Sequence, residues 1–128
     1  VILCVGENLI DREEGQALEF IKNQLHECLP DNFENLIVAY EPIWSIGTGK
    51  IPSVFEIDEM HKHIKEISFG IVNKKIEVLY GGSVSLHNIN NILNIQNVDG
   101  VLVGGASLKV KDFLAIYSAA VKHLDDSL

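Results

Sequence analysis

Residues 36–50 read LIVAYEPIWSIGTGK, a short apolar run that ends in a glutamate and a glycine-rich loop. The run is continuous and partly β-branched, as expected of a strand that is buried on both faces of a parallel sheet. Similar runs occupy Val1–Val5, Ile76–Tyr80 and Val101–Val103. They alternate with segments of helical periodicity, so the sequence predicts an α/β fold of parallel strands joined by right-handed crossovers.

The segments between the runs repeat apolar residues at helical spacing, over residues 17–29, 57–67, 89–93 and 113–124. Ser53 and Glu56 predict a capping box at the start of the second helix. Gly70 is expected to end that helix, and residues 125–127 are expected to form a solvated tail. No linker or change of composition divides the chain, so we expect a single domain.

The composition excludes several classes of protein. Of the 128 residues, 47% are hydrophobic and 22% are charged, which is typical of a globular chain rather than a disordered one. The net charge of −8 comes with no basic stripe, so we expect no nucleic-acid partner. The apolar runs are far shorter than a membrane span, and the first residues do not read as a signal peptide. We therefore expect a cytoplasmic protein that does not bind membranes.

The cysteines and histidines do not have the spacing of a metal site. Cys4 and Cys28 form no CxxC pair and are expected to be buried thiols of a reducing compartment. His61 and His63 are two residues apart on a predicted helix and would point to different faces. A surface or packing role is expected of these two and of the remaining histidines, His26, His87 and His123. The sequence therefore predicts no bound metal.

Each apolar run is followed by an acidic or glycine-rich sequence: Gly6-Glu7, Glu41–Lys50, Gly81–Val84 and Gly104–Ser107. The carboxyl ends of parallel strands meet at one edge, where glycine amides and helix N-termini can bind an anion. The loops match neither a Walker loop nor GxGxxG, so they favour a small phosphorylated ligand over a nucleotide. For any one loop alone, a simple tight turn is an equal alternative.

Glu41 is the candidate catalytic carboxylate. It ends a predicted strand and precedes Pro42, which favours an extended backbone and aims the side chain into the mouth of the sheet. Burial at that position would raise its basicity. Judged from the residues alone, catalysis and a structural pairing with a neighbouring loop are equally supported.

Four motifs resemble those of the triose-phosphate isomerase family in order and spacing. They are LCVGE at 3–7, AYEPIWSIGTGK at 39–50, YGGSV at 80–84 and DGVLVGGASL at 99–108. The resemblance covers nearly the whole chain and implies the (β/α)8 TIM barrel, which needs about 250 residues. Residues 1–128 would then form the C-terminal half of a single barrel domain, strands five to eight, and we expect the chain to be a fragment.

The resemblance also implies the chemistry. Glu41 would be the general base that interconverts dihydroxyacetone phosphate and D-glyceraldehyde 3-phosphate through an enediol or enediolate, a step of glycolysis and gluconeogenesis. The backbone N–H groups of Gly47, Ser83, Gly104 and Gly105 would hold the substrate phosphate. Neither a cofactor nor a metal is implied.

Residues 42–52 would form a mobile lid, and the resemblance implies that Glu7 and Trp44 meet when this lid is open. Pro52 departs from the family pattern, because many relatives have a small residue at the far hinge of the lid. Proline lacks an N–H group, so this position cannot donate a hydrogen bond to the hydroxyl of Tyr80.

A larger departure is that the family's catalytic lysine and electrophilic histidine belong to the half of the barrel that this chain does not contain. Lys50, Lys109 and His87 do not match the positions of that lysine or histidine, so none of them is assigned these roles. We therefore expect the chain alone to be inactive, and we expect a homodimer only of the full-length parent.

Two other interpretations remain open. The chain could be a non-catalytic half-barrel that binds phosphate and needs a partner chain. Another phosphate-binding barrel enzyme would fit the glycine loops, but it would not fit the segment from Glu41 to Lys50.

Overall fold

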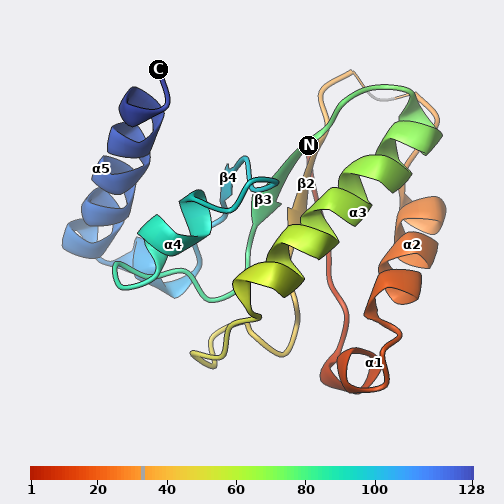
Figure 1. Ribbon diagram of the computed structural model, residues 1–128, viewed down its shortest axis with the longest axis horizontal. Helices are drawn as coiled ribbons and strands as arrows, with labels where there is room; N and C mark the ends of the chain where they lie inside the picture. The colour runs from red at the N-terminus through yellow and green to blue at the C-terminus, as the bar shows by residue number, and fades with distance from the viewer. Residues whose placement is uncertain (33) are drawn as a thin grey trace.

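The computed structural model describes residues 1–32 and 34–128. Its strands are β1 (Ile2–Val5), β2 (Ile37–Tyr40), β3 (Glu77–Tyr80) and β4 (Gly100–Val101). All neighbouring strands are parallel, and their order in the sheet is the order in the chain (Figure 1). The predicted parallel α/β architecture is therefore confirmed.

Helices connect and follow the strands. They are α1 (Leu9–Glu13), α2 (Ala17–Cys28), α3 (Val54–Val72), α4 (Ile89–Leu93), the 3-10 helix η1 (Gly105–Leu108) and α5 (Val110–Asp126). Neither α1 nor η1 was predicted, because one turn is too short to show a helical period. Helix α5 also includes Asp125 and Asp126, so these two residues are helical rather than a tail, but they are exposed to solvent as predicted.

Helix α3 starts where it was predicted to start and ends later. The Ser53 hydroxyl accepts a hydrogen bond from the Glu56 amide at 3.2 Å, and the Glu56 carboxylate accepts one from the Ser53 amide at 2.7 Å. The predicted stop at Gly70 is wrong, because the helix continues to Asn73, which has a left-handed φ of 54°. Asparagine tolerates this conformation because its short side chain can hydrogen-bond locally.

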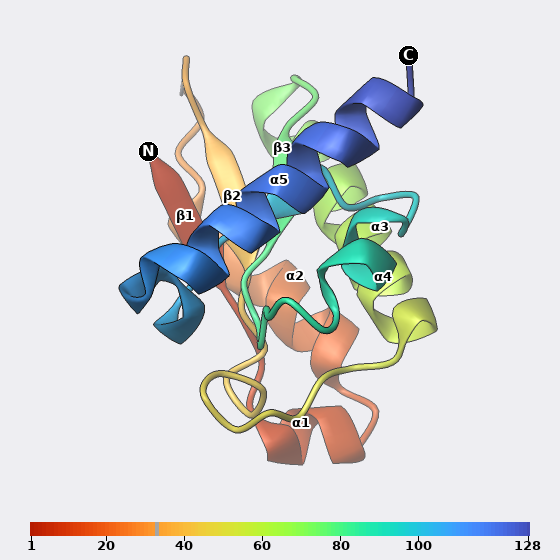
Figure 2. The ribbon, with the colours of Figure 1, turned by 90° about the vertical axis from the view of Figure 1, so that its left-hand side faces the viewer.

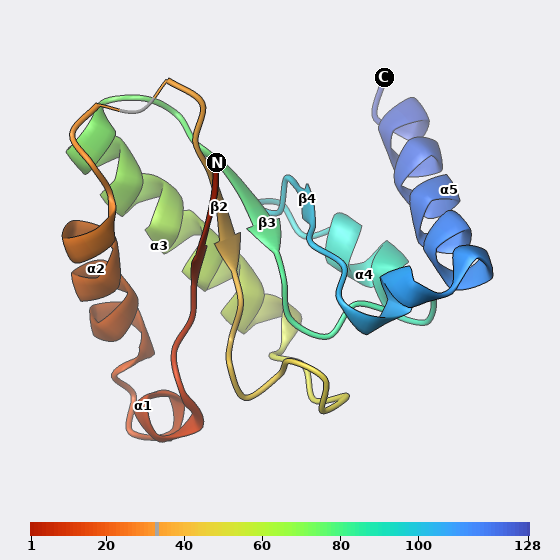
Figure 3. The same cartoon turned by 180° about the vertical axis from the view of Figure 1, so that it is seen from behind.

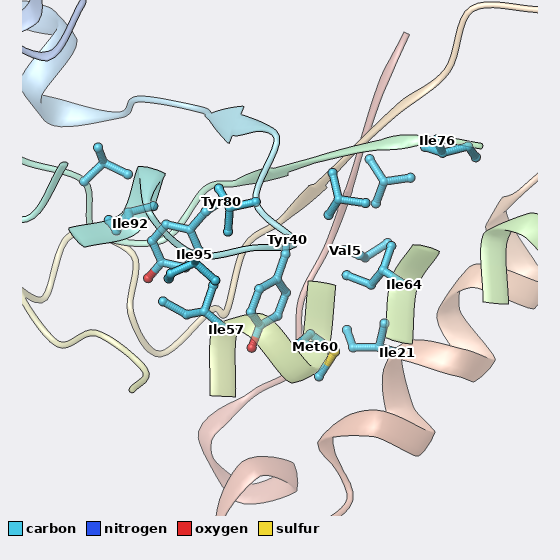
Figure 4. Close-up of a cluster of buried hydrophobic side chains, with 14 of the residues drawn as sticks. Val5, Ile21, Tyr40, Ile57, Met60, Ile64, Ile76, Tyr80, Ile92 and Ile95 are labelled. Atoms are coloured by element: carbon cyan, nitrogen blue, oxygen red, sulfur yellow. The ribbon is translucent and has the colours of Figure 1, made fainter. Parts of the chain in front are cut away.

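The core lies between the sheet and helices α2 and α3, which lie side by side over one face (Figure 1). Alternate residues of the central strands point toward these helices, and Tyr40 and Tyr80 are the largest of them (Figure 4). The apolar rows of the two helices complete the cluster with Ile21, Leu25, Ile57, Met60 and Ile64. The apolar stripes predicted on α2 and α3 are therefore buried. The stripe predicted over residues 113–124 is wrong for most of α5, where Ile116 is buried but Phe113, Tyr117 and Leu124 are exposed.

On the opposite face of the sheet, no helix of the described residues lies over β1, β2 and β3 (Figure 3). Helix α5 crosses in front of these strands in Figure 2, but it stands apart from them in Figure 1. Ile2, Cys4 and Glu77 are exposed, so the prediction that the strands are buried on both faces is wrong for β1 and β3. On β2 between them, Ala39 of the same face is buried. Continuous apolar strands belong to sheets covered on both sides, and this chain supplies a cover for one side. An open apolar face of this kind is what half of a barrel would present.

Both cysteines are exposed, so the prediction of buried thiols is wrong. Cys4 lies on the uncovered side of the sheet. Cys28 lies at the end of α2, beside the buried row formed by Ala17, Ile21 and Leu25. In each case the neighbouring residues in the sequence are apolar, but no other part of the described chain covers the thiol.

His61 has the packing role that was expected of it. It is fully buried on α3, with its ring 5.7 Å from the ring of Tyr40 and 6.3 Å from that of Tyr80. Among the described residues, neither ring nitrogen makes a hydrogen bond of good geometry. Burial lowers the pKa of His61 from 6.5 to about 4, and the nearby Asn97 backbone opposes this only in part.

We expect the free energy of unfolding to fall as the pH drops from 6.5 to about 4. In this range the unfolded chain binds a proton on His61 that the native state does not. A pKa lowered from 6.5 to about 4 corresponds to ~3 kcal/mol. Urea unfolding at pH 7 and pH 4.5 measures the loss, and His61→Leu should remove this part of it. His26→Asn, at an exposed position, is the control. An unchanged pH dependence in His61→Leu would contradict the assignment.

Candidate functional site

The loops that follow the four strands gather at one edge of the sheet (Figure 3). A pocket of about 490 Å³ lies there, between residues 41–49, the turn after β3 and the turn after β4. All five residues singled out from the sequence line this pocket: Glu41, Gly47, Ser83, Gly104 and Gly105. The parallel topology therefore brings together the carboxylate and the amides that the motifs suggested.

Glu41 enters the pocket directly from β2. Its amide donates to the Val5 carbonyl at 2.7 Å, and its side chain is half-buried. The side chain runs close over Gly81, where an added Cβ would lie 2.6 Å from the Glu41 Cγ. Partial burial, with the hydrogen bond and charge of Glu41, raises the pKa of the Cys4 thiol to about 11. Glu41 is thus held between the ends of β1 and β3.

Gly6 allows the backbone that follows β1 to approach the backbone of Glu41 closely. An added Cβ at Gly6 would lie 1.6 Å from the Glu41 carbonyl oxygen and 2.5 Å from its carbonyl carbon. These distances are far below van der Waals contact, so the two backbones can approach only because position 6 has no side chain. The loop after β1 therefore packs directly against the backbone of Glu41 and supports its position.

Glu7 is the centre of a buried polar cluster beside the pocket. Its Oε1 accepts hydrogen bonds from the Tyr40 hydroxyl at 2.7 Å and from the Trp44 indole at 3.1 Å. The Arg12 guanidinium donates to the same oxygen at 3.0 Å and to the Tyr40 hydroxyl at 3.0 Å. Burial and the charge of Glu7 raise the pKa of Tyr40, so its hydroxyl keeps its proton.

The contact between Glu7 and Trp44 that the resemblance implied is therefore present. Arg12 and Tyr40 were not predicted as members of the cluster. Arg12 lies on α1, a helix too short to be recognised from periodicity, and no motif marks it. Tyr40 ends a predicted strand, where an aromatic residue is read as core.

Ser45 connects the loop after β2 with the turn after β3. Its side chain is fully buried, and its hydroxyl donates to the Lys50 carbonyl at 2.5 Å. The Ser83 amide donates to the same hydroxyl oxygen at 3.1 Å, and the Ser83 hydroxyl donates to the Ser45 carbonyl. The Tyr80 hydroxyl lies 3.4 Å from the Ser45 hydroxyl. Residues 45–50 are thus tied to β3 through one side chain.

The glycines of the pocket differ in backbone conformation and in the space around their Cα atoms. Gly47 has a φ of 68°, a left-handed conformation that favours glycine. At Gly104 and Gly105 an added Cβ would meet no protein atom within 4 Å. A Cβ at either of these two positions would therefore not clash with the protein.

Within residues 1–32 and 34–128, no cluster of three or more His, Cys, Asp or Glu side chains is arranged to hold a metal ion. None of the helices described is long and apolar enough to cross a bilayer.

Comparisons with known proteins match this fold and site. The family profile described as triosephosphate isomerase matches residues 1–120. The chain belongs to this family. A triosephosphate isomerase from Rhizobium meliloti is 47% identical over 92% of this chain, and one from a Chelativorans species is 45% identical over 94%. The chain spans 48% and 49% of these two relatives, about half of their length.

A solved structure gives the same result in three dimensions. The triosephosphate isomerase from Bartonella henselae superposes with a TM-score of 0.83 at 36% identity, over 93% of this chain and 50% of that one. The parallel sheet with its helices therefore corresponds to half of a TIM barrel, as the resemblance implied.

Proposed function

We propose that this chain carries the catalytic base of a triosephosphate isomerase that interconverts dihydroxyacetone phosphate and D-glyceraldehyde 3-phosphate in glycolysis and gluconeogenesis. The observation that carries the proposal is the pocket in which Glu41 lies with the amides of Gly47, Ser83, Gly104 and Gly105. Membership of the family supports this assignment.

In this mechanism the Glu41 carboxylate removes a proton from one carbon of the triose and returns it to the neighbouring carbon. The intermediate is an enediol or enediolate, and the step needs neither a metal nor a cofactor. A base acts in this way only when it lies within hydrogen-bond reach of the proton. Glu41 lines the same pocket as the glycine loops, which supports its role as the base for a substrate whose phosphate lies on those loops.

Backbone amides suit the phosphate because the chain has a net charge of −8. A dianion that approaches an acidic protein needs local donors, and fixed N–H groups supply them without a mobile counter-charge. The proposed partner is therefore a small triose phosphate rather than a nucleic acid or a membrane.

The proposed activity belongs to a completed barrel. The electrophilic lysine and histidine of the family lie in the other half, so we expect residues 1–128 alone to be inactive. The full-length parent is proposed to be a cytoplasmic homodimer.

A second candidate is a non-catalytic half-barrel that binds phosphate and pairs with a partner chain. The uncovered face of the sheet and the free edges of β1 and β4 favour it. The coding sequence before Val1 distinguishes the two candidates. A first half with the lysine and histidine loops supports the enzyme, and a start codon near Val1 supports the half-barrel.

The phosphate site can be tested on this chain directly. In an NMR titration with inorganic phosphate, we expect saturable shifts of the Ser83, Gly104 and Gly105 amides, with a Kd of about 1 mM. Gly105→Val should weaken binding at least about tenfold, because its side chain occupies the space of the anion and removes a charge-assisted hydrogen bond.

The matched control is Gly70→Ala, another glycine with open space around its Cβ but far from the pocket. It should bind phosphate as the unmodified chain does. If a folded sample shows no saturable shift at any of the three amides, the phosphate site is wrong.

A further inference from the structure

Ser45 is a buried hydrogen-bonding residue for which the proposed chemistry gives no role. Its hydroxyl donates to the Lys50 carbonyl at 2.5 Å, which closes residues 45–50 into a loop on its own side chain. The same oxygen accepts from the Ser83 amide at 3.1 Å. A single hydroxyl group thus joins the far part of the loop after β2 to the turn after β3.

The structure of that turn accommodates the Ser45 hydroxyl. An added Cβ at Gly82 would lie 2.8 Å from the Ser45 Oγ and 2.2 Å from the Tyr80 hydroxyl. The turn can therefore approach Ser45 this closely only because position 82 is glycine. The Ser83 hydroxyl adds a second link, to the Ser45 carbonyl.

Pro52 makes this link important. Proline has no N–H group, so the end of the loop cannot donate to the Tyr80 hydroxyl from position 52. In the structure the Tyr80 hydroxyl lies 3.4 Å from the Ser45 hydroxyl instead. Ser45 supplies from the start of the loop an attachment to β3 that Pro52 cannot supply from its end.

The link also uses a group that the ligand needs. The Ser83 amide is one of the proposed phosphate donors, and it lies on the wall of the pocket. In the structure this amide donates to the Ser45 hydroxyl. One N–H group has one proton to donate, so a phosphate oxygen can take this hydrogen bond only if the Ser45 hydroxyl gives it up.

We propose that Ser45 is a positioning residue that occupies the Ser83 amide in the absence of ligand and is released when a phosphate group takes its place. Ligand binding is thereby coupled to the position of residues 45–50. This inference rests on the proposed phosphate site and adds to it a residue that regulates access to the Ser83 amide. The coupling requires only that the anion and the hydroxyl compete for one donor.

The ligand-free state is tested with Ser45→Ala. The variant should speed hydrogen exchange of the Ser83 amide by about two- to tenfold, because its acceptor is gone. Trp44 is the one tryptophan of the chain and neighbours Ser45. Its fluorescence should shift to the red as the loop loosens and the half-buried ring becomes more hydrated.

The matched control is Ser68→Ala. Ser68 is also fully buried, but its hydroxyl has no hydrogen-bond partner among the described residues, and it lies on α3. This variant removes the same atom from the same residue type without touching the loop. It should leave the Trp44 emission and the Ser83 exchange rate unchanged.

The competition itself is tested with inorganic phosphate. In the unmodified chain, Trp44 emission and the Ser83 amide shift should follow one saturation curve. Ser45→Ala should bind phosphate about two- to tenfold more tightly, because no hydrogen bond has to be broken first. Simple structural damage would weaken binding instead. Trp44 in the variant should respond little to phosphate, since the loop is already released.

Three results would overturn the inference. The first is unchanged Trp44 emission and Ser83 exchange in Ser45→Ala, and the second is unchanged or weaker phosphate affinity in a folded Ser45→Ala sample. The third is a Trp44 signal in the unmodified chain that does not follow phosphate while the Gly105 amide shifts. If Ser45→Ala does not fold, this third measurement still tests the inference. Absence of shifts at Ser83, Gly104 and Gly105 together would instead refute the phosphate site and with it the coupling.

Discussion

Glu41→Gln is expected to lower the isomerase kcat by about 10²- to 10⁴-fold in a completed barrel. The substitution keeps the shape of the side chain, and so its packing over Gly81, but removes the carboxylate that accepts the proton. Phosphate affinity should change little, because the phosphate is held by backbone amides of other residues. A barrel can be completed by joining residues 1–128 to the first half of a relative such as the Rhizobium meliloti enzyme.

The measurement is a coupled assay of triose-phosphate interconversion, with phosphate inhibition as the measure of anion binding. Gly105→Val is the contrasting variant, since it should raise KM and the phosphate inhibition constant more than it lowers kcat. A Glu41→Gln barrel that loses phosphate binding but keeps its kcat would show that the two roles are assigned to the wrong residues. Measurable turnover by residues 1–128 alone would contradict the need for the missing half.

The part of the site that the sequence predicted is the part that follows from parallel topology. Once strands ending at Val5, Tyr40, Tyr80 and Val101 lie side by side, the residues just after them must share one edge. Glu41 and the glycine loops need no further information to meet there. The buried rows of α2 and α3 were predicted from local periodicity. The order of the strands does not follow from periodicity, and only the barrel implied by the family resemblance points to it.

The features that escaped prediction depend on contacts between distant segments. Arg12 reaches Glu7 and Tyr40 from a helix with no periodic signal. Whether Cys4 is buried depends on whether a second layer covers the sheet, and an apolar strand looks the same in either case. At the end of α3, the sequence pattern predicts a stop at Gly70, but the left-handed conformation that ends the helix is that of Asn73.

Ser45 belongs to a third group. It stands inside a recognised motif, but its neighbours in space, Lys50, Tyr80 and Ser83, could not be paired with it from spacing alone. Its burial and its hydrogen bonds are visible only when the turn after β3 is placed over it. Sequence motifs thus located the chemistry, while the structure shows how the loop that carries it is held.

Gly6→Ala is expected to be the most destabilising single substitution at this edge of the sheet. Its methyl group would lie 1.6 Å from the Glu41 carbonyl oxygen, and the obstacle is backbone rather than a flexible side chain. Either β1 or the start of the loop after β2 must move, so we expect a loss of about 3 kcal/mol or more in the free energy of unfolding. Urea unfolding followed by circular dichroism measures it.

Gly70→Ala tests whether the effect at Gly6 is due to the close approach rather than to the loss of a glycine. Gly70 lies inside α3, and an added Cβ there meets nothing within 4 Å. Alanine favours a helix over glycine by about 1 kcal/mol, so this variant should be slightly more stable than the unmodified chain. If Gly6→Ala were as stable as the unmodified chain, the position of Glu41 would not depend on the close approach of the loop after β1.

A Gly6→Ala chain that still folds must have moved the end of β1 and Glu41 apart, because the clash is with the carbonyl of Glu41. Cys4 reports the displacement, since the neighbouring carboxylate contributes to its raised pKa of about 11. As Glu41 moves away, the pKa of Cys4 should fall toward its ordinary value, and the thiol should react faster with an alkylating reagent at pH 8 to 9. Cys28, which is also exposed, gives the reference rate in the same sample. A folded variant with unchanged Cys4 reactivity would mean that Glu41 keeps its place by some support other than Gly6.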